Sequence, residues 1–267
     1  EVLDKIKQKE ALGGEHFFED VENDPPTKML MPNDVDYLNT KLSSKIKNFY
    51  CNRVVNKMLK GYAVEHQIEV KGIENLNVEG GAVVTTNHFN YFDSAPFIYA
   101  MKQSKSKHKF HIIIREGNYQ IDGKLGFLLK NYNTFPLSSN IKTTINLNHA
   151  IDTVLKKNHF LLVYPEQAMW WNYKKPRLYR IGAYRWASRN NVPVIPCFCT
   201  MEDLDTFEPD GLPKQKLTYH IMPPIYPNPN LSEKDNAQYM LHKNHQMCVE
   251  LYEKVYKQKL VYDSEEE

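Results

Sequence analysis

Short apolar runs along the chain alternate with longer segments in which apolar residues recur every three or four positions. The short runs predict buried strands, and the longer segments predict amphipathic helices. Strands that alternate with helices favour an α/β fold, with a largely parallel central sheet flanked by helices and an N-terminal amphipathic helical extension. The predicted strands are 62–70, 82–86, 110–114, 133–137, 160–164, 193–200 and 217–222. The predicted helices are 34–61, 93–102, 118–130, 141–157, 180–190 and 232–259.

This pattern divides the chain into three parts. We expect an N-terminal arm and basic helix over 1–61, a central α/β domain over 62–230, and a C-terminal helix with an acidic tail over 231–267. Residues 1–33 combine an acidic cluster with several prolines and show little periodicity, which predicts one short helix and a loose arm. We assign no chemistry to this arm.

The predicted helix over 34–61 is both apolar on one side and basic. Asn33 or Asp34 can cap its start and Gly61 can end it. Its apolar stripe consists of Val35, Leu38, Leu42, Ile46, Phe49 and Val54. Between Tyr37 and Gly61 the sequence has six Lys or Arg residues and no acidic residue. Such a helix either lies on an anionic membrane surface or packs on the core with a solvated cationic face, and the pattern leaves both open.

Composition narrows the class of protein. The chain has 267 residues, 42% of them hydrophobic, enough for a full core. A net charge of +2 gives no case for nucleic acid as a partner. The four cysteines show no metal-ligand spacing, so we expect free thiols in a reducing compartment and no metal. We expect no signal peptide, and no apolar run approaches the roughly 18 residues that span a bilayer.

The strongest candidate for chemistry is the stretch Asn87-His88-Phe89-Asn90-Tyr91-Phe92-Asp93. It follows a predicted strand, and Asp93 with Pro96 has the pattern of a helix start. His88 and Asp93 would point apart on one continuous helix, but a strand-to-helix turn can bring them together. A carboxylate that accepts from one imidazole nitrogen fixes the tautomer and leaves the other nitrogen as a general base.

Two later blocks accompany this stretch in a fixed order: Leu161-Leu162-Val163-Tyr164-Pro165-Glu166, and then Val192-Pro193-Val194-Ile195-Pro196. Together the three blocks resemble the glycerolipid acyltransferase family, which includes lysophosphatidic acid acyltransferases, over about residues 60 to 225. The resemblance implies that 62–230 is the catalytic domain, with His88 as general base and Asp93 orienting it. It also implies an acyl-CoA or acyl carrier protein as donor, a lysolipid or glycerol phosphate-type acceptor, and no cofactor. Asn87 and the backbone amides at the helix start are the candidates for stabilising the oxyanion.

The sequence departs from the family pattern in two places. The second block usually carries an Arg near 133–137 that holds the acceptor's phosphate, whereas this chain has no basic residue from Asn133 to Ser139. The third block usually reads Pro-Glu-Gly and then Thr-Arg, whereas here Glu166 is followed by Gln167. We therefore expect Glu166, Lys175, Arg177 and Arg115 to contact substrate. Either one of these cations replaces the lost Arg, or the acceptor carries less charge.

Two other functions remain open from the residues alone. A thioester hydrolase would use the same base on water, and a lipid-binding module of the same fold would have no turnover. The lipid substrates of the resembling family imply a cytoplasmic protein, peripheral at the inner face of the membrane. Membrane contact is expected through residues 37–61 and the pair Trp170-Trp171, since Trp favours the interface.

Overall fold

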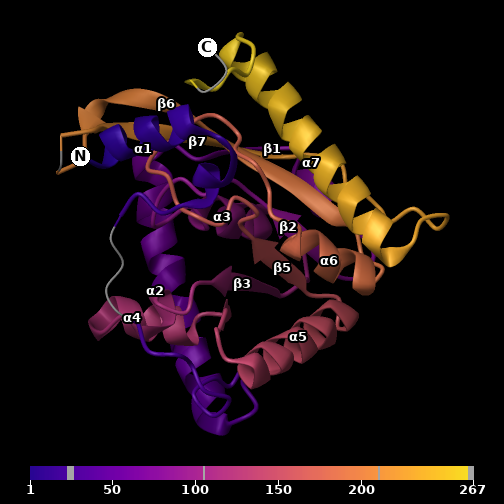
Figure 1. The fold of residues 1–267 in the computed structure, drawn as a ribbon. Coiled ribbons are helices and arrows are strands. Elements are labelled where there is room, and N and C mark those ends of the chain that lie inside the picture. Colours follow the sequence, from indigo (N-terminus) through magenta and orange to yellow (C-terminus); the bar gives the residue numbers. More distant parts are fainter. Residues whose placement is uncertain (23–26, 105, 210, 264–267) are drawn as a thin grey trace.

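A computed structural model describes residues 1–22, 27–104, 106–209 and 211–263 (Figure 1). In these ranges the strands are β1 (Glu69–Lys71), β2 (Ala82–Thr85), β3 (Phe110–Ile114), β4 (Thr134–Pro136), β5 (Phe160–Val163), β6 (Val194–Phe207) and β7 (Pro213–Ile221). The α-helices are α1 (Val2–Leu12), α2 (Leu42–Glu65), α3 (Ala95–Gln103), α4 (Gly123–Asn131), α5 (Ile141–Lys156), α6 (Gly182–Arg189) and α7 (Glu233–Tyr256). The 3-10 helices are η1 (Gly14–Phe18), η2 (Ile73–Leu76) and η3 (Asn118–Gln120).

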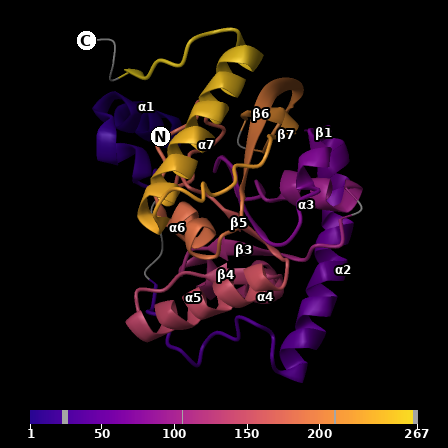
Figure 2. The ribbon, with the colours of Figure 1, turned by 90° about the vertical axis from the view of Figure 1, so that its right-hand side faces the viewer.

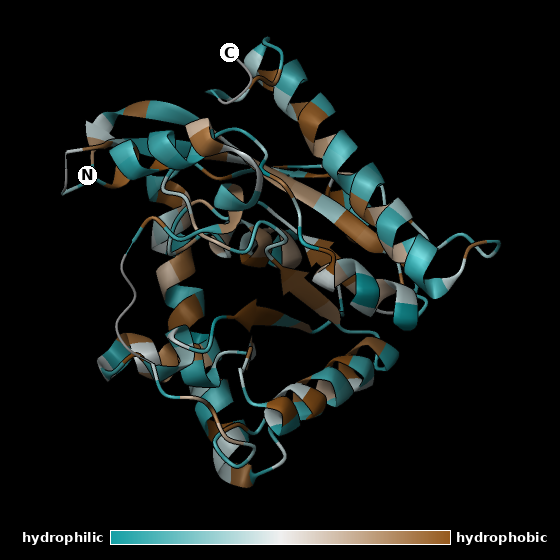
Figure 3. Ribbon diagram, in the orientation of Figure 1, coloured by the Kyte–Doolittle hydropathy of each residue, from teal (hydrophilic) through white to brown (hydrophobic). Residues whose placement is uncertain are grey.

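The described strands form one sheet in the order β1-β7-β6-β2-β5-β3-β4. β6 and β7 pair antiparallel, and every other neighbouring pair is parallel. The central strands are short and almost wholly apolar, as their brown colour in Figure 3 shows. Buried parallel strands have this composition because helices cover both of their faces. The predicted α/β class with a largely parallel sheet is confirmed.

Alternate residues of each central strand face opposite layers of helices. Val84 and Leu162 point into a cluster with α2 and α3, while Val83 and Leu161 point into a cluster with α5, α6 and α7. Figure 2 shows the sheet between these two groups of helices. Because α2 and α7 bury side chains in the same clusters as the sheet, they share its core. The division at residues 61 and 230 stays a prediction.

A third, smaller cluster joins the two ends of the chain. Phe17 from the N-terminal segment and Tyr262 from the C-terminal segment pack with Trp170, which follows β5. The ring centroids of Phe17 and Trp170 lie 5.7 Å apart. Residues 1–22 therefore include a helix and a turn packed on the loop that follows β5, rather than only a loose arm.

Helix α2 differs from the predicted helix at both ends. Asp36 accepts hydrogen bonds from the backbone N–H groups of Thr40 (2.9 Å) and Lys41 (3.1 Å), which makes a turn where the helix was expected to begin. Gly61 does not stop the helix, which continues to Glu65. The last helical turn therefore occupies the start of the predicted strand 62–70. The strand itself is limited to β1.

Two other predicted elements change length for local reasons. The single helix expected over 118–130 is divided into η3 and α4, because Asp122 between them is extended (φ −84°, ψ 170°). Strand β6 continues well past Thr200, because its second half pairs with β7 as an antiparallel hairpin. The polar residues of that half lie largely outside the core, so the apolar run that predicted the strand ended too early.

The apolar stripe expected on α2 lies on the surface. Leu42, Ile46 and Phe49 are exposed, whereas the core side of the helix carries Cys51 and Leu59. Exposed Tyr50 meets Phe127 of α4 edge to face, with ring centroids 6.2 Å apart. We call the exposed residues Leu42, Ile46, Phe49, Tyr50, Leu125 and Phe127 the α2–α4 apolar surface. In the described part of the chain, no helix is both long and apolar enough to cross a bilayer.

Candidate active site

His88 and Asp93 come into direct contact at the carboxyl edge of the sheet. His88 follows the end of β2, and its Nδ1 shares a hydrogen bond with Oδ2 of Asp93. The side chain of Asp93 is 4% exposed and that of His88 17%. An ionised Asp93 accepts from Nδ1–H, so Nε2 is the nitrogen that remains for a substrate proton. The arrangement can therefore act as a general base.

The turn between β2 and α3 creates this contact. Asp93 does not cap α3, whose N-cap is Ser94. Its carboxylate turns back instead and also accepts from the backbone N–H of Phe89 at 3.2 Å. Asn90 stabilises the turn, because its side-chain oxygen accepts from the backbone N–H of Phe92 at 2.8 Å. The five-residue spacing of His88 and Asp93 thus suits a turn of this shape.

Tyr164, at the end of β5, stacks on the imidazole. The ring centroids of His88 and Tyr164 lie 4.3 Å apart, with 25° between the planes. Burial, followed by the nearby charge of Asp93, raises the pKa of Tyr164 well above its ordinary value. The phenol therefore stays neutral and limits the orientations of the His88 ring.

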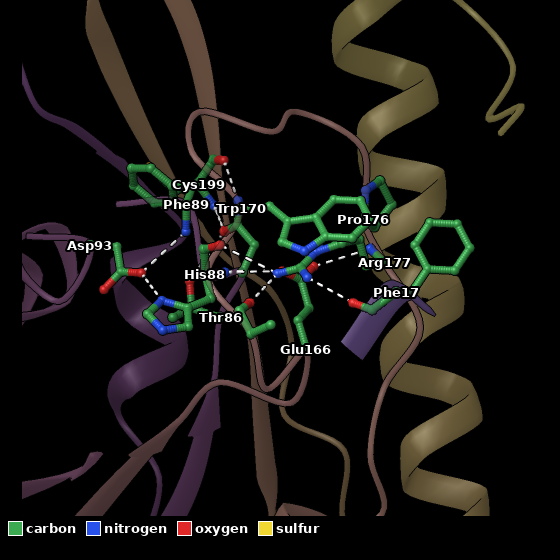
Figure 4. A network of polar contacts seen from close by, with 12 residues as sticks. Phe17, Thr86, His88, Phe89, Asp93, Glu166, Trp170, Pro176, Arg177 and Cys199 are labelled. Atoms are coloured by element: carbon green, nitrogen blue, oxygen red, sulfur yellow. Dashed lines mark hydrogen bonds and ion pairs between the residues drawn. The ribbon is translucent and has the colours of Figure 1, made fainter. Parts of the chain in front are cut away.

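Glu166 and Arg177 form a buried ion pair behind His88 (Figure 4). Nη2 of Arg177 donates to Oε2 of Glu166 at 2.9 Å, and the side chains are 0% and 2% exposed. Oε2 of Glu166 also accepts from the backbone N–H of His88 at 3.1 Å. The pair therefore contacts the backbone of the candidate base rather than the solvent-facing side of the site.

Arg177 and Glu166 are buried, so the prediction that they contact a substrate is wrong, whereas the side chain of Lys175 is 25% exposed and its contact with a substrate stays a prediction. Arg177 is fully buried, and the ring of Trp170 lies 4.6 Å from its guanidinium carbon. Nζ of Lys175 lies 2.5 Å from Glu10 of α1 and 3.7 Å from Asp263 near the C-terminus. The N-terminal segment, which the sequence left without a role, supplies these partners.

Other cations of the same stretch are also held in ion pairs. Lys174 pairs with Asp203 of β6, and Arg180 pairs with Glu15 of η1. Arg189 of α6 pairs with Asp152 of α5. These three basic residues are thus held in separate ion pairs on different elements of the fold.

Asn87 does not face the site as an oxyanion donor. Its amide nitrogen donates to the carbonyl of Cys199 at 3.0 Å, and its amide oxygen accepts from the Cys199 N–H at 2.8 Å. Both ends of the buried amide are thereby used to join the end of β2 to β6. The prediction that Asn87 stabilises the oxyanion is therefore wrong, and its side chain has a structural role instead.

Arg115 lies where the sequence placed it, directly after β3. Nη1 of Arg115 donates to Asp20 at 2.9 Å, and its side chain is 38% exposed. β5 separates β2 from β3, so the ends of these strands lie about 10 Å apart. Among the predicted substrate contacts, Arg115 is the cation that directly follows a strand at the carboxyl edge.

Next to Arg115, the carboxylate of Glu116 contacts the segment that follows β4. The side chain of Glu116 accepts from the hydroxyl of Ser138 at 2.9 Å and from that of Ser139 at 3.0 Å. It also accepts from the backbone N–H of Leu30 at 2.6 Å. Against the effect of burial, these hydrogen bonds lower the pKa of Glu116. The negative charge of Glu116 disfavours the binding of a phosphate beside Ser138 and Ser139.

The described residues carry neither a metal-ligand cluster nor an exposed thiol. They include no group of three or more His, Cys, Asp or Glu side chains arranged to hold a metal ion. All four cysteines are free and buried. Burial raises the pKa of the Cys197, Cys199 and Cys248 thiols, which keeps them protonated and unreactive.

Sequence reasoning missed several residues around His88. Phe17, Trp170 and Tyr164 all contact the His88–Glu166–Arg177 group. Trp170 was expected at a membrane interface but is fully buried, so that prediction is wrong. The position of Tyr164 directly before Pro165-Glu166 gave a local signal, whereas nothing near Phe17 indicated its contact.

Comparison with known proteins identifies a family and a similar fold. A search of curated proteins found no significant match. Among solved structures, the chain is similar to the crystal structure of the 1-acyl-sn-glycerophosphate (LPA) acyltransferase PlsC from Thermotoga maritima. The TM-score is 0.51 and the identity 18%, over 82% of this chain and 81% of that one, a likeness of fold. Residues 67–200 match the family model described as Acyltransferase, and they include β2 to β5 and the His88–Asp93 pair. The chain therefore belongs to the acyltransferase family.

Proposed function

We propose that this acyltransferase moves a fatty acyl group from an acyl thioester to a hydroxyl of a lysolipid acceptor, with His88 as general base. The observation that carries the proposal is the hydrogen bond between Nδ1 of His88 and Asp93 at the carboxyl edge of the sheet. In open α/β sheets, ligands bind outside the carboxyl ends of the strands. A binding module has no need of an imidazole held in one tautomer.

The step proceeds without an acyl-enzyme. Nε2 of His88 takes the proton from the acceptor hydroxyl as its oxygen forms a bond to the thioester carbonyl carbon. The carbon–sulfur bond then breaks, and the thiolate takes the proton back from the imidazolium. Asp93 holds the imidazole and stabilises its positive charge, as the acid does in other triads. Either acyl-CoA or an acyl carrier protein supplies such a thioester.

Arg115 supports an acceptor that carries a phosphate. Arg115 directly follows β3, whose carboxyl end lies about two strand spacings from that of β2. A guanidinium forms paired hydrogen bonds with phosphate oxygens. The acceptor's phosphate would replace Asp20 on Arg115 and avoid the neighbouring carboxylate of Glu116. The structurally similar protein from Thermotoga maritima is a 1-acyl-sn-glycerophosphate acyltransferase, which agrees with such an acceptor.

The α2–α4 apolar surface supports peripheral binding to the inner face of the cell membrane, where lysolipid acceptors reside. Phe49 and Ile46 are exposed there, and Lys45, Lys47 and Arg53 lie on the same helix. Aromatic and aliphatic side chains insert among lipid headgroups, while Lys and Arg are attracted to anionic lipids. The protein would thus meet its acceptor at the membrane surface while its core stays in the cytoplasm.

Product analysis tests the proposed reaction. The protein is incubated with isotope-labelled acyl-CoA, with and without a lysophosphatidic acid in anionic vesicles, and the lipids are identified by mass spectrometry. Labelled phosphatidic acid that forms only with acceptor supports the proposal. Labelled free fatty acid in both reactions, at one rate, would instead show a thioester hydrolase. No product from acyl-CoA or from acyl carrier protein thioester would leave only a lipid-binding role. His88→Ala is the matched control for background hydrolysis.

A further inference from the structure

Arg177 contacts the backbone of His88 although it cannot reach a substrate. Its side chain has no exposed surface, and Nη2 lies 3.4 Å from the carbonyl oxygen of His88. The backbone N–H of Trp170 donates to the same carbonyl at 3.1 Å. On the other side of the His88 Cα, Glu166 accepts from the backbone N–H at 3.1 Å. The ion pair and its loop thus hold both peptide groups that flank His88.

Stability alone does not account for a buried arginine at this place. A buried ion pair costs desolvation free energy, and well-packed apolar residues of similar volume are commonly as stable. Arg177 also directs donors at carbonyl groups, with Nη1 2.9 Å from the carbonyl oxygen of Phe17 and Nη2 bonded to that of Ala168. The two hydrogens of Nη2 are thus shared among Glu166, Ala168 and His88, with His88 the most distant acceptor.

The contact with Phe17 connects the site to a distant part of the sequence. Phe17 belongs to η1, outside residues 67–200 that match the family. Its ring stacks on Trp170, whose indole N–H donates to the carbonyl of Glu19 at 2.9 Å. Loss of this packing would leave Arg177 with one carbonyl acceptor fewer and expose it to water.

We propose that Arg177 is a positioning residue, which sets the orientation of His88 and makes it depend on the docked N-terminal segment. This inference rests on the proposed acyl transfer. Asp93 holds Nδ1, while Glu166, the Trp170 N–H and the Arg177 that pairs with Glu166 contact the backbone of His88, so Nε2 is aimed at one point in the site. A misplacement of about 1 Å can lower a rate by about 100-fold without weakening binding.

The test compares Arg177→Gln and Arg177→Lys with wild type and with Arg180→Gln. Arg180 is the matched control because it also pairs with the N-terminal segment, at Glu15, but has no contact with His88. We expect Arg177→Gln to lower kcat by about 100-fold, with the KM of donor and acceptor changed less than threefold. Arg177→Lys keeps the charge beside Glu166, so its melting temperature should recover while its kcat stays low. Arg180→Gln should keep a kcat within threefold of wild type.

Two further variants test the link to the N-terminal segment. Phe17→Ala removes the ring that packs on Trp170 and should lower kcat by about 10-fold at unchanged KM. Leu3→Ala, on an exposed position of α1, is its control and should have no effect. If Arg177→Gln does not fold, Arg177→Lys and Phe17→Ala decide the question.

A proton NMR measurement distinguishes this inference from the reaction itself. The proton that Nδ1 of His88 shares with Asp93 gives a strongly deshielded resonance, which His88→Ala assigns. We expect it to shift or broaden in both Arg177 variants and to stay in place in Arg180→Gln. An inactive wild type would reject the proposed reaction while this resonance still reports the geometry. An active wild type whose kcat and resonance both survive in Arg177→Lys and Phe17→Ala would overturn the positioning role.

Discussion

Glu166 accepts a hydrogen bond from the backbone N–H of His88 at 3.1 Å, although 78 residues separate the two in sequence. They meet because β2 and β5 are adjacent parallel strands, paired from Ala82 with Phe160 to Thr85 with Val163. Equivalent positions past the ends of such strands lie about one strand spacing apart. The parallel pairing thus lets the turn after β5 support the base that follows β2.

Glu166→Ala should destabilise the fold strongly. The substitution leaves the guanidinium of Arg177 buried without its carboxylate, and breaking a buried pair costs about 3–5 kcal/mol. Urea denaturation of the variant and the wild type measures the difference. Glu15→Ala is the control, because its pair with Arg180 is exposed and such pairs contribute about 0–1 kcal/mol. An equal loss of unfolding free energy in both variants would show that the buried pair contributes no more to stability than the exposed one.

His88→Ala should abolish acyl transfer and leave the fold intact. General-base catalysis contributes about 10²–10⁴-fold, and the half-buried imidazole lies at a strand end rather than in the core. Asp93→Asn should cost less, since the base remains and only its orientation and tautomer are disturbed. Initial rates and thermal melts of each variant provide the measurement. Near-normal turnover in a folded His88→Ala protein would exclude the mechanism.

The parts of this structure that depend on local sequence were predictable. The central strands are apolar runs bounded by polar residues, and the contact of His88 with Asp93 depends on a turn of only five residues. The three sequence blocks identified the family, which the match over 67–200 supports. Each single strand, turn or sequence block is set by residues close together in the chain.

Side-chain directions that depend on distant segments were not predictable. Lys175 and Arg177 both follow Glu166 closely, yet their partners Glu10 and Phe17 are 165 and 160 residues away. No periodicity in the sequence indicates that the N-terminal segment packs on this loop. The predicted start of α2 is wrong for a different reason. The Asp36 side chain accepts hydrogen bonds from backbone N–H groups that would otherwise bond within a helix.

Buried histidines should make the fold sensitive to acid. Burial, followed by the charges of His159 and Lys109, lowers the pKa of His111 from its ordinary value to about 3. In the unfolded chain this group binds a proton near pH 6.5, so stability falls as the pH drops from about 6.5 towards 3. At pH 5 the loss from this one group is about 2 kcal/mol.

His111→Gln removes this titration and should flatten the dependence of the unfolding free energy on pH between 6.5 and 4. Urea denaturation at several pH values measures the slope. His149→Gln, at an exposed position of α5, is the control and should keep the wild-type slope. An unchanged slope in His111→Gln would assign the acid sensitivity to other groups, of which His220, with a pKa lowered to about 4 by burial, is the next.

The α2–α4 apolar surface should bind anionic vesicles. Sedimentation with vesicles containing phosphatidylglycerol should recover the wild type at low salt and less of it at high salt, since salt screens the attraction of Lys45, Lys47 and Arg53. The double substitution I46S and F49S should lower the partition coefficient at least about 10-fold, because each exposed side chain contributes about 1.5–3 kcal/mol when fully buried. Phe207→Ser, at an exposed apolar residue of β6, should change nothing. Equal binding of all three proteins would leave the surface without a role at membranes.

The pairing of Arg115 with Asp20 gives a test of the acceptor's charge. If the acceptor's phosphate replaces Asp20, Arg115→Gln should raise the acceptor KM about 10-fold, the lower end for a hydrogen bond to a charged group at a partly exposed site. Asp20→Asn removes one carboxylate that competes for Arg115 and should lower the same KM about two- to fivefold, as expected for an exposed ion pair. The KM of the acyl donor should stay constant in both variants, and Arg189→Gln, whose partner Asp152 lies on α5, should leave every constant unchanged. Opposite shifts of the acceptor KM in the two variants identify Arg115 as the phosphate contact. An acceptor KM equal to that of the wild type in both variants, together with a preference for an uncharged lysolipid, would reject the phosphate-bearing acceptor. The proposed acyl transfer would still stand.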